Sequence, residues 1–290
     1  MPEKASHVLN VIAENAGASA EALRGFGEPV WLAKGRVFDI PVGNDTAVLS
    51  RAREIIGESE SVDMNLIPIA NRRKRLLVAD MDSTIIGCEC LDELADMAGL
   101  KPPVAAITER AMRGEIEFAP ALRERVALLQ GLPLSALQRV YDERVRLNPG
   151  AKELLATMRA HGAKTLLVSG GFTFFTGRVA AAAGFHSDQA NILLDDGARL
   201  LGAVAEPILG REAKLAALEE ATRENGLDFA DTLAVGDGAN DLGMIGRAGL
   251  GVAYHAKPIV AAAAAASITH GDLTALLYLQ GYREDEIVAS

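Results

Sequence analysis

The chain has few cysteine and few aromatic residues. Of its 290 residues, two are cysteines, Cys88 and Cys90, and 4% are aromatic. Two thiols one residue apart do not build a disulfide framework, and they do not complete a four-ligand zinc site. We therefore expect both thiols to be reduced and to have no structural role.

An excess of positive charge is also missing. The chain has 29 Lys and Arg against 39 Asp and Glu, a formal net charge of −10. Nucleic-acid binding usually needs a clustered basic surface, and the sequence has no large basic stripe. The N-terminal residues form no apolar signal core, and the longest run of small apolar residues, Ile259 to Ile268, is about half a membrane span. We expect a cytoplasmic protein with a small-molecule partner and neither a nucleic-acid nor a membrane partner.

The length suggests two units, because domains typically have roughly 100 to 200 residues. Residues 1–72 contain few segments: strand candidates at Pro29–Leu32, Arg36–Ile40 and Val62–Ile69, and a helical stretch at Asp45–Ile56. This pattern predicts a small α+β domain that packs on something else. A basic run at residues 71–75 indicates a solvated linker before the second domain, residues 73–290.

From Leu76 onward, apolar strand candidates alternate with helical segments. Alternation of this kind predicts a Rossmann-like α/β fold with a parallel sheet and helices on both faces. The strand candidates are Leu76–Ala79, Thr165–Val168, Thr232–Val235 and Leu250–Ala253. Between them, residues 88–148 have helical patterns without obvious strands, which predicts an inserted helical cap. Asn148-Pro149 then indicates a helix start and His161-Gly162 its end.

Polar side chains follow three of these strands. Asp80, Ser169 and Asp237 each come at a strand end, and the carboxyl ends of parallel strands meet at one edge of a sheet. A carboxylate such as Asp80 can attack phosphorus, and Asp82 could protonate the leaving oxygen and then deprotonate water. Alone, the Asp-X-Asp pair is more often a turn or helix cap; the preceding strand and Ser83-Thr84 favour a reaction site.

Two further segments suit a phosphate ester. Ser169-Gly170-Gly171 offers a hydroxyl and backbone N–H groups that can hold an anion. The glycine-rich loop Gly236 to Asp241 carries two carboxylates and an amide, and such oxygen ligands favour Mg²⁺. Lys214, which alone is typical of a surface lysine, could place an ammonium beside Asp80.

The motifs Asp80-Met81-Asp82-Ser83-Thr84, Ser169, Lys214 and Gly236 to Asp241 resemble, in order, the four motifs of haloacid dehalogenase-type phosphatases. The resemblance implies that Asp80 becomes the phosphoaspartate and that Asp82 is the acid and base. It also implies phosphoryl or substrate contacts from Ser169, Gly170, Lys214 and Asn240. By the same resemblance, Mg²⁺ lies at Asp80, the backbone carbonyl of Asp82, and Asp237, with Asp241 in support.

Within that superfamily the chain resembles the phosphoserine phosphatases. Glu89, Met112, Phe118 and Arg125 of the cap fit the family's substrate-facing pattern. Glu89 can pair with an ammonium, Arg125 can hold a carboxylate, and the two apolar side chains can exclude water. The resemblance implies Mg²⁺-dependent hydrolysis of O-phospho-L-serine to L-serine and phosphate, the last step of serine biosynthesis.

The N-terminal domain resembles the ACT-like segment of some relatives through its approximate βαβ order. We expect it to serve packing or formation of a homodimer rather than serine sensing.

Three alternatives remain from sequence. The chain could be a same-fold phosphatase or phosphotransferase for another small ester, such as phosphothreonine, phosphohomoserine or a sugar phosphate. It could be a phosphoacceptor signalling domain that keeps its phosphoryl group, although Asp82 argues against this. It could also be a regulatory amino-acid-binding protein without turnover.

Overall fold

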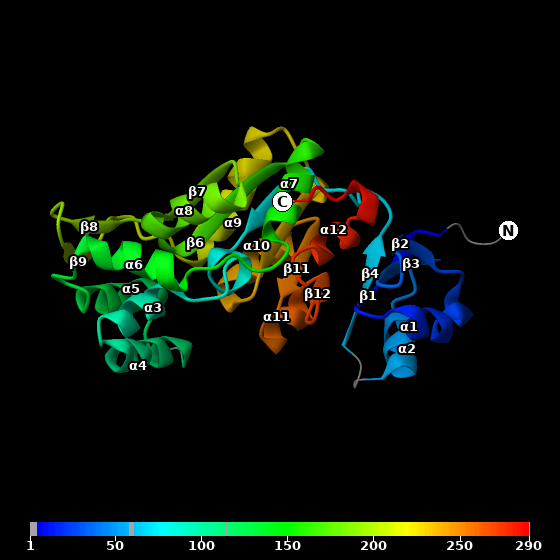
Figure 1. The fold of residues 1–290 in the computed structure, drawn as a ribbon, viewed down its shortest axis with the longest axis horizontal. Helices are drawn as coiled ribbons and strands as arrows, with labels where there is room; N and C mark the ends of the chain where they lie inside the picture. The colour runs from blue at the N-terminus through cyan, green and yellow to red at the C-terminus, as the bar shows by residue number, and fades with distance from the viewer. Residues whose placement is uncertain (1–4, 58–60, 114, 290) are drawn as a thin grey trace.

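The computed structural model describes residues 5–57, 61–113 and 115–289. Three parts follow one another along the long axis: a helical cap, a central sheet with its helices, and a small N-terminal domain (Figure 1). Within the described residues, none of the helices is both long enough and apolar enough to cross a membrane.

The central sheet has six parallel strands in the order β12-β11-β10-β5-β6-β7. β5, which ends just before Asp80, lies between β10 and β6. This arrangement confirms the predicted α/β fold class. The strands are β5 (Leu76–Ala79), β6 (Lys164–Phe172), β7 (Ser187–Asn191), β10 (Thr232–Gly236), β11 (Leu250–Tyr254) and β12 (Ala266–Ile268).

Both faces of the sheet are covered by helices, which explains the uninterrupted apolar run of β5. Leu77 and Ala79 belong to the core that contains α7 and α8, while Leu76 and Val78 pack with residues of α9 and α10. Successive strand residues point to opposite faces, so a strand buried on both sides is apolar throughout. The helices are α7 (Ala151–Ala160), α8 (Thr173–Ala183), α9 (Arg211–Glu224), α10 (Leu242–Arg247), α11 (Pro258–Ala263) and α12 (Ala275–Leu279).

The cap consists mainly of the helices that the sequence indicated: α3 (Cys90–Met97), α4 (Lys101–Met112), α5 (Phe118–Ala127) and α6 (Leu134–Arg144). Its two connections to the core run antiparallel and pair at Ile86 and Leu147. A hairpin that the sequence analysis did not identify, β8 (Leu193–Asp195) and β9 (Leu200–Val204), packs against α5.

The prediction that Asn148 begins a helix is wrong. α7 begins at Ala151, after Gly150 in a left-handed conformation with φ of 80°. The side chain of Asn148 instead donates a hydrogen bond to the carbonyl of Thr84 at 2.8 Å. Asn148 therefore ties the second cap connection to the loop that carries Asp80 and Asp82. The predicted end agrees, because α7 ends at Ala160 and Gly162 has a φ of 81°.

The N-terminal domain has the element order βαββαβ and a four-stranded antiparallel sheet in the order β2-β3-β1-β4. This is a ferredoxin-like arrangement. The central strand β1 was not predicted from the sequence, because the polar Asn10 interrupts its apolar pattern. The Asn10 side chain donates a hydrogen bond to Asp39 at 2.8 Å. The elements are β1 (His7–Ala13), α1 (Gly17–Ala22), β2 (Val30–Ala33), β3 (Val37–Val42), α2 (Ala47–Ile56) and β4 (Val62–Pro68).

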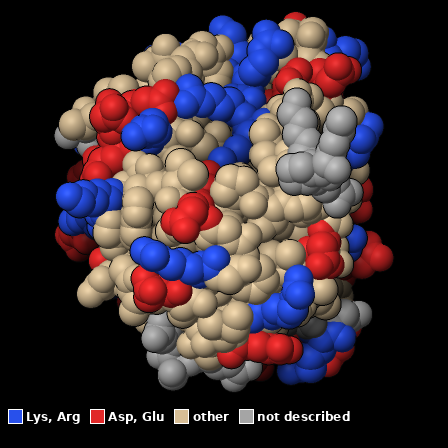
Figure 2. Space-filling model, turned by 90° about the vertical axis from the view of Figure 1, so that its right-hand side faces the viewer, with Lys and Arg blue, Asp and Glu red and all other residues tan. Residues whose placement is uncertain are grey.

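Polar contacts join the N-terminal domain to the domain that contains the parallel sheet. Arg72 forms an ion pair with Asp39 at 2.5 Å and donates to the carbonyls of Tyr278 and Leu279. Arg36 pairs with Glu284. Figure 2 shows the molecule from the end at which the N-terminal domain lies. Basic and acidic side chains are intermixed on this face and separated by other residues.

Asp63 makes the densest of these contacts. Its buried carboxylate accepts backbone N–H groups of Thr269 at 2.7 Å, His270 at 3.1 Å and Gly271 at 2.8 Å. In Asp63→Ala these three N–H groups lose their charged acceptor. We therefore expect the free energy of unfolding to fall by about 3 kcal/mol. Urea unfolding followed by fluorescence of Trp31, the chain's one tryptophan, measures the change. Glu54→Ala, an exposed carboxylate of the same domain, is the control; equal midpoints for both variants would contradict the prediction.

Candidate active site

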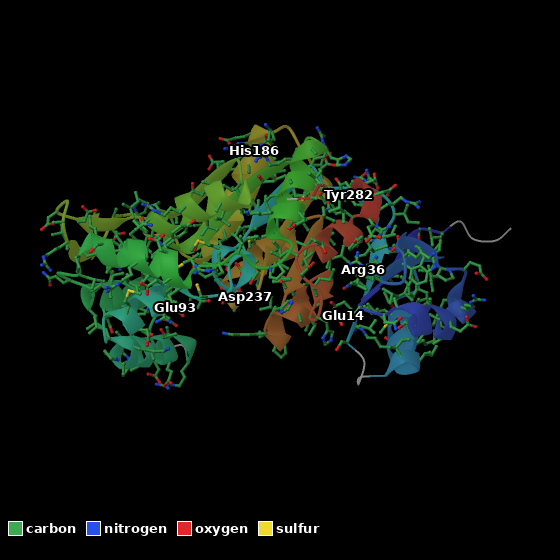
Figure 3. The ribbon with its side chains drawn as sticks, in the orientation of Figure 1. Glu14, Arg36, Glu93, His186, Asp237 and Tyr282 are labelled. Atoms are coloured by element: carbon green, nitrogen blue, oxygen red, sulfur yellow. The ribbon has the colours of Figure 1, made fainter. Side chains whose placement is uncertain are left out.

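The parallel sheet brings the predicted strand-end residues together. Asp80, Asp82, Ser169 and Asp237 line one cavity of about 450 Å³ between the sheet edge and the cap. In Figure 3, Asp237 lies where the cap approaches the sheet, whereas Arg36 lies on the opposite side, at the N-terminal domain. The strand ends that the sequence indicated therefore share one site.

One detail of the sequence prediction was wrong at Ser169. β6 does not end at Val168 but continues to Phe172, and its register with β7 shifts between these two residues. Residues 169–171 are thus an irregular stretch of strand rather than a turn. In this stretch the buried Ser169 hydroxyl lines the cavity and accepts a hydrogen bond from the Gly171 N–H at 2.8 Å.

Asp80 is buried and held on one side by an ammonium. Its Oδ1 lies 2.6 Å from Nζ of Lys214 and accepts the N–H of Met81 at 2.8 Å. Burial raises the pKa of Asp80 well above its usual value; Lys214 lowers it and Asp241 raises it. Although burial lowers the pKa of Lys214, the carboxylates of Asp80 and Asp241 raise it above its usual value, so this lysine is a fixed positive charge.

Asp82 turns its carboxylate in another direction. Ser83 adopts a left-handed conformation with φ of 55°, which bends the chain directly after Asp82. The Asp82 carboxylate accepts the Ser169 hydroxyl at 3.1 Å and the backbone N–H of Cys90, the first residue of the cap helix α3, at 2.9 Å. Burial and, to a lesser extent, Glu89 raise the pKa of Asp82 to about 6. The two neighbouring aspartates therefore have different environments.

Three carboxylates form a compact oxygen cluster. Asp80, Asp237 and Asp241 each offer an oxygen, and these atoms lie within 4.8 Å of one another. Thr84 donates to Asp237 at 3.1 Å, and Asp241 accepts both Lys214 at 2.7 Å and the Gly238 N–H at 3.0 Å. Burial, followed by Asp241, raises the pKa of Asp237 to about 6.

This donor set fits a hard divalent cation, because carboxylate oxygens are the ligands that Mg²⁺ prefers. A cation bound there would also offset the electrostatic repulsion between the neighbouring carboxylates. Position 236 requires a glycine, because the Cβ of any other residue would lie 2.3 Å from Cγ of Asp241. The side chain of Asp82 does not belong to the cluster. The predicted contact between Mg²⁺ and the backbone carbonyl of Asp82 stays a prediction.

The cap contributes the opposite wall of the cavity. Glu89, Phe118 and Arg125 line it, as does Asn240 from the core. Glu89 accepts the Ser83 hydroxyl at 2.7 Å, and Phe118 lies over Gly170, whose added Cβ would be 3.1 Å from the ring.

Arg125 is half-buried, and Nη1 of its guanidinium lies 3.5 Å from the Thr108 hydroxyl. Burial lowers the pKa of Arg125. Met112 is the last residue of α4, but its side chain lies outside the described residues, so its predicted contact is untested. Lys214 contacts Asp80 and does not itself line the cavity.

Several lining residues were missed by the sequence analysis, including Asp92, Thr108 and Lys257. Lys257 had a recognisable signal, because it follows β11, the one predicted strand whose end was not assigned a chemical group. Asp92 and Thr108 lie on α3 and α4, where helical spacing alone does not distinguish a cavity-facing polar residue from a solvated one.

Comparison with known proteins agrees with this architecture. The haloacid dehalogenase-like hydrolase family matches residues 77–245. A curated phosphoserine phosphatase from a Polaromonas species is 47% identical over 210 residues, which cover 71% of this chain and 89% of that protein.

Two solved structures resemble nearly the whole chain. A haloacid dehalogenase family hydrolase from Salmonella enterica serovar Typhi has a TM-score of 0.87 at 27% identity, covering 98% of this chain and all of the other. A probable phosphoserine phosphatase from Vibrio cholerae has a TM-score of 0.80 at 31% identity, covering 97% and 88%. The chain therefore belongs to the haloacid dehalogenase-like hydrolase family, and it is a phosphatase.

Proposed function

We propose that the chain hydrolyses O-phospho-L-serine to L-serine and phosphate. The observation that carries this proposal is the arrangement of the cavity: a carboxylate paired with a buried lysine lies on the core side, and an arginine and a glutamate line the cap side. The first pair suits a phosphoryl group, and the second suits the carboxylate and ammonium of an amino acid. The similarity to phosphoserine phosphatases supports the same substrate.

In the first half-reaction, an oxygen of Asp80 forms a bond to phosphorus while the bond from phosphorus to the serine oxygen breaks. Asp82 gives its proton to the departing oxygen, which leaves as the serine hydroxyl. The pKa of about 6 for Asp82 supports this role, because part of the population carries a proton near neutral pH. The first products are L-serine and an aspartyl phosphate at Asp80.

In the second half-reaction, Asp82 takes a proton from water, and the water oxygen attacks phosphorus. The bond from phosphorus to Asp80 breaks, which releases phosphate, restores the Asp80 carboxylate and leaves Asp82 protonated for the next cycle. We propose that the Lys214 ammonium offsets the charge of the phosphoryl oxygens and that the Ser169 hydroxyl donates a hydrogen bond to one of them. Mg²⁺ held by Asp80, Asp237 and the Asp82 carbonyl, with Asp241 in support, would screen the repulsion between the phosphate and the carboxylates.

Arg125 is proposed to select the substrate by binding its carboxylate. We expect Arg125→Gln to lower kcat/KM for O-phosphoserine by about 100-fold, since a paired charge of this kind contributes about 2 to 3 kcal/mol. Hydrolysis of an aryl phosphate without a carboxylate should change by much less. Arg123→Gln is the matched control, because Arg123 lies on the same helix and pairs with Glu206 outside the cavity. Equal losses on both substrates would argue against this role.

Phosphate release from a substrate panel tests the proposed function. The panel contains O-phosphoserine, O-phosphothreonine, phosphohomoserine and a sugar phosphate, each with and without Mg²⁺. The proposal predicts the highest kcat/KM for O-phosphoserine. A higher kcat/KM for another ester would show that this ester, and not O-phosphoserine, is the preferred substrate. Stable stoichiometric phosphorylation without turnover would favour a signalling domain.

We also propose that the reaction is the last step of serine biosynthesis and takes place in the cytoplasm, by analogy with the family.

The N-terminal domain is proposed to serve packing or homodimer formation. The exposed edge strand β2, where Val30 is 49% exposed, supports a second copy as its partner. Sedimentation of the full chain, which gives either a dimer or a monomer mass, decides this point.

A further inference from the structure

Lys257 enters the active-site cavity from an element that none of the family motifs includes. It is the residue before α11, in the loop that follows β11. Its backbone N–H donates to the carbonyl of Asp237 at 3.4 Å, and Pro258 behind it restricts its backbone to an extended conformation. The chain is therefore anchored beside the oxygen cluster, while the Lys257 side chain lines the cavity.

The charges around the cavity give this lysine a distinct position. Among the residues that the structure describes, five carboxylates line the cavity, and the cations that line it are Arg125 on the cap and Lys257 on the core. The ammonium of Lys214 is buried and shared by Asp80 at 2.6 Å and Asp241 at 2.7 Å. Lys257 is exposed, and within the described part of the chain its ammonium has no ion pair or side-chain hydrogen bond.

A phosphate dianion that enters this cavity from solvent meets a mostly negative wall. An exposed, unshared ammonium at the mouth is the group that such an anion can contact without displacing another partner. Clefts that present a charge of opposite sign raise the association rate of a charged substrate. A flexible lysine can also follow the anion, because its ammonium is a point charge on a four-carbon chain.

We propose that Lys257 is a phosphate-binding residue of the core, which receives the phosphoryl dianion at the cavity mouth before it reaches Asp80. This inference deepens the proposed function and rests on it for the identity of the whole substrate. It concerns the phosphoryl group alone, so it applies to any phosphomonoester that the cavity accepts.

Replacement of Lys257 by Gln tests the inference. The Mg²⁺-loaded full chain is titrated with inorganic phosphate by calorimetry, and kcat and KM are measured for O-phosphoserine at several ionic strengths. We expect Lys257→Gln to weaken phosphate binding about tenfold and to raise KM by a similar factor, with kcat within about twofold of the wild type. The fall of kcat/KM with added salt should become shallower, because exposed charges are screened.

Two further variants make the test specific. Lys257→Arg keeps the charge and should keep most of the phosphate affinity. Lys152→Gln removes an exposed lysine of α7 outside the cavity and should leave all values unchanged. Phosphate affinity in Lys257→Gln equal to that of the wild type would overturn the inference. If the wild type failed to hydrolyse O-phosphoserine, the proposed function would fail, and phosphate affinity would still decide the role of Lys257.

Discussion

Asp80→Asn is expected to abolish turnover while leaving the fold intact. The amide has nearly the same size as the carboxylate but is not a nucleophile, so no aspartyl phosphate can form. We expect kcat for O-phosphoserine to fall by about 10⁴-fold or more, the scale seen when a covalent nucleophile is removed. Phosphate release under saturating substrate measures the loss.

The structure defines the control for this experiment. Asp80→Asn also removes one of the two carboxylates that pair with Lys214, so its thermal unfolding is compared with that of the wild type. Asp142→Asn, an exposed position on the cap helix α6, gives the same chemical change away from the cavity and should retain activity. Turnover by a folded Asp80→Asn protein near the wild-type rate would eliminate Asp80 as the nucleophile.

Asp82→Asn is expected to separate the two half-reactions. An amide cannot supply or accept the catalytic proton, so kcat for O-phosphoserine should fall by about 10²–10⁴-fold. With p-nitrophenyl phosphate, whose leaving group needs little help from a proton, the first step should persist. Attack by water on the aspartyl phosphate still requires a base, so the phosphorylated protein should accumulate.

Rapid mixing with p-nitrophenyl phosphate detects this accumulation as a burst of p-nitrophenol close to one equivalent per active site. Mass spectrometry of the quenched protein should then place one phosphoryl group on Asp80. The geometry supports the distinction between the aspartates, because Asp80 faces Lys214 while Asp82 faces Ser169 and Cys90. Absence of both a burst and a phosphorylated Asp80 would contradict the assigned role of Asp82.

Four of the six strands of the central sheet, β5, β6, β10 and β11, could be predicted because their local pattern and their environment agree, whereas β7 and β12 were not predicted. Leu76 to Ala79 are apolar throughout, and the strand is buried on both faces. The convergence of Asp80, Ser169 and Asp237 followed from the geometry of parallel sheets, which does not depend on side-chain detail. The cap residues expected to face the substrate were predicted through family resemblance, because Glu89 and Arg125 alone look like ordinary helix charges.

Other features depend on contacts distant in sequence. β1 contains Asn10, whose side-chain partner Asp39 comes from β3, so its buried amide could not be recognised locally. The β8–β9 hairpin did have a local signal, Asp196-Gly197, a pair typical of tight turns; Gly197 has a φ of 89° there. Its packing on α5 brings it to the cap, although it lies beyond the predicted cap boundary.

We propose that this cavity hydrolyses O-phospho-L-serine with Mg²⁺ held by its carboxylates. Release of phosphate from O-phospho-L-serine by the purified full chain tests it most directly, after chelation of divalent cations and again after addition of Mg²⁺. We expect negligible release after chelation and rapid, stoichiometric formation of L-serine and phosphate once Mg²⁺ is restored. Undiminished release in the chelated protein, or none in the restored protein, would contradict it.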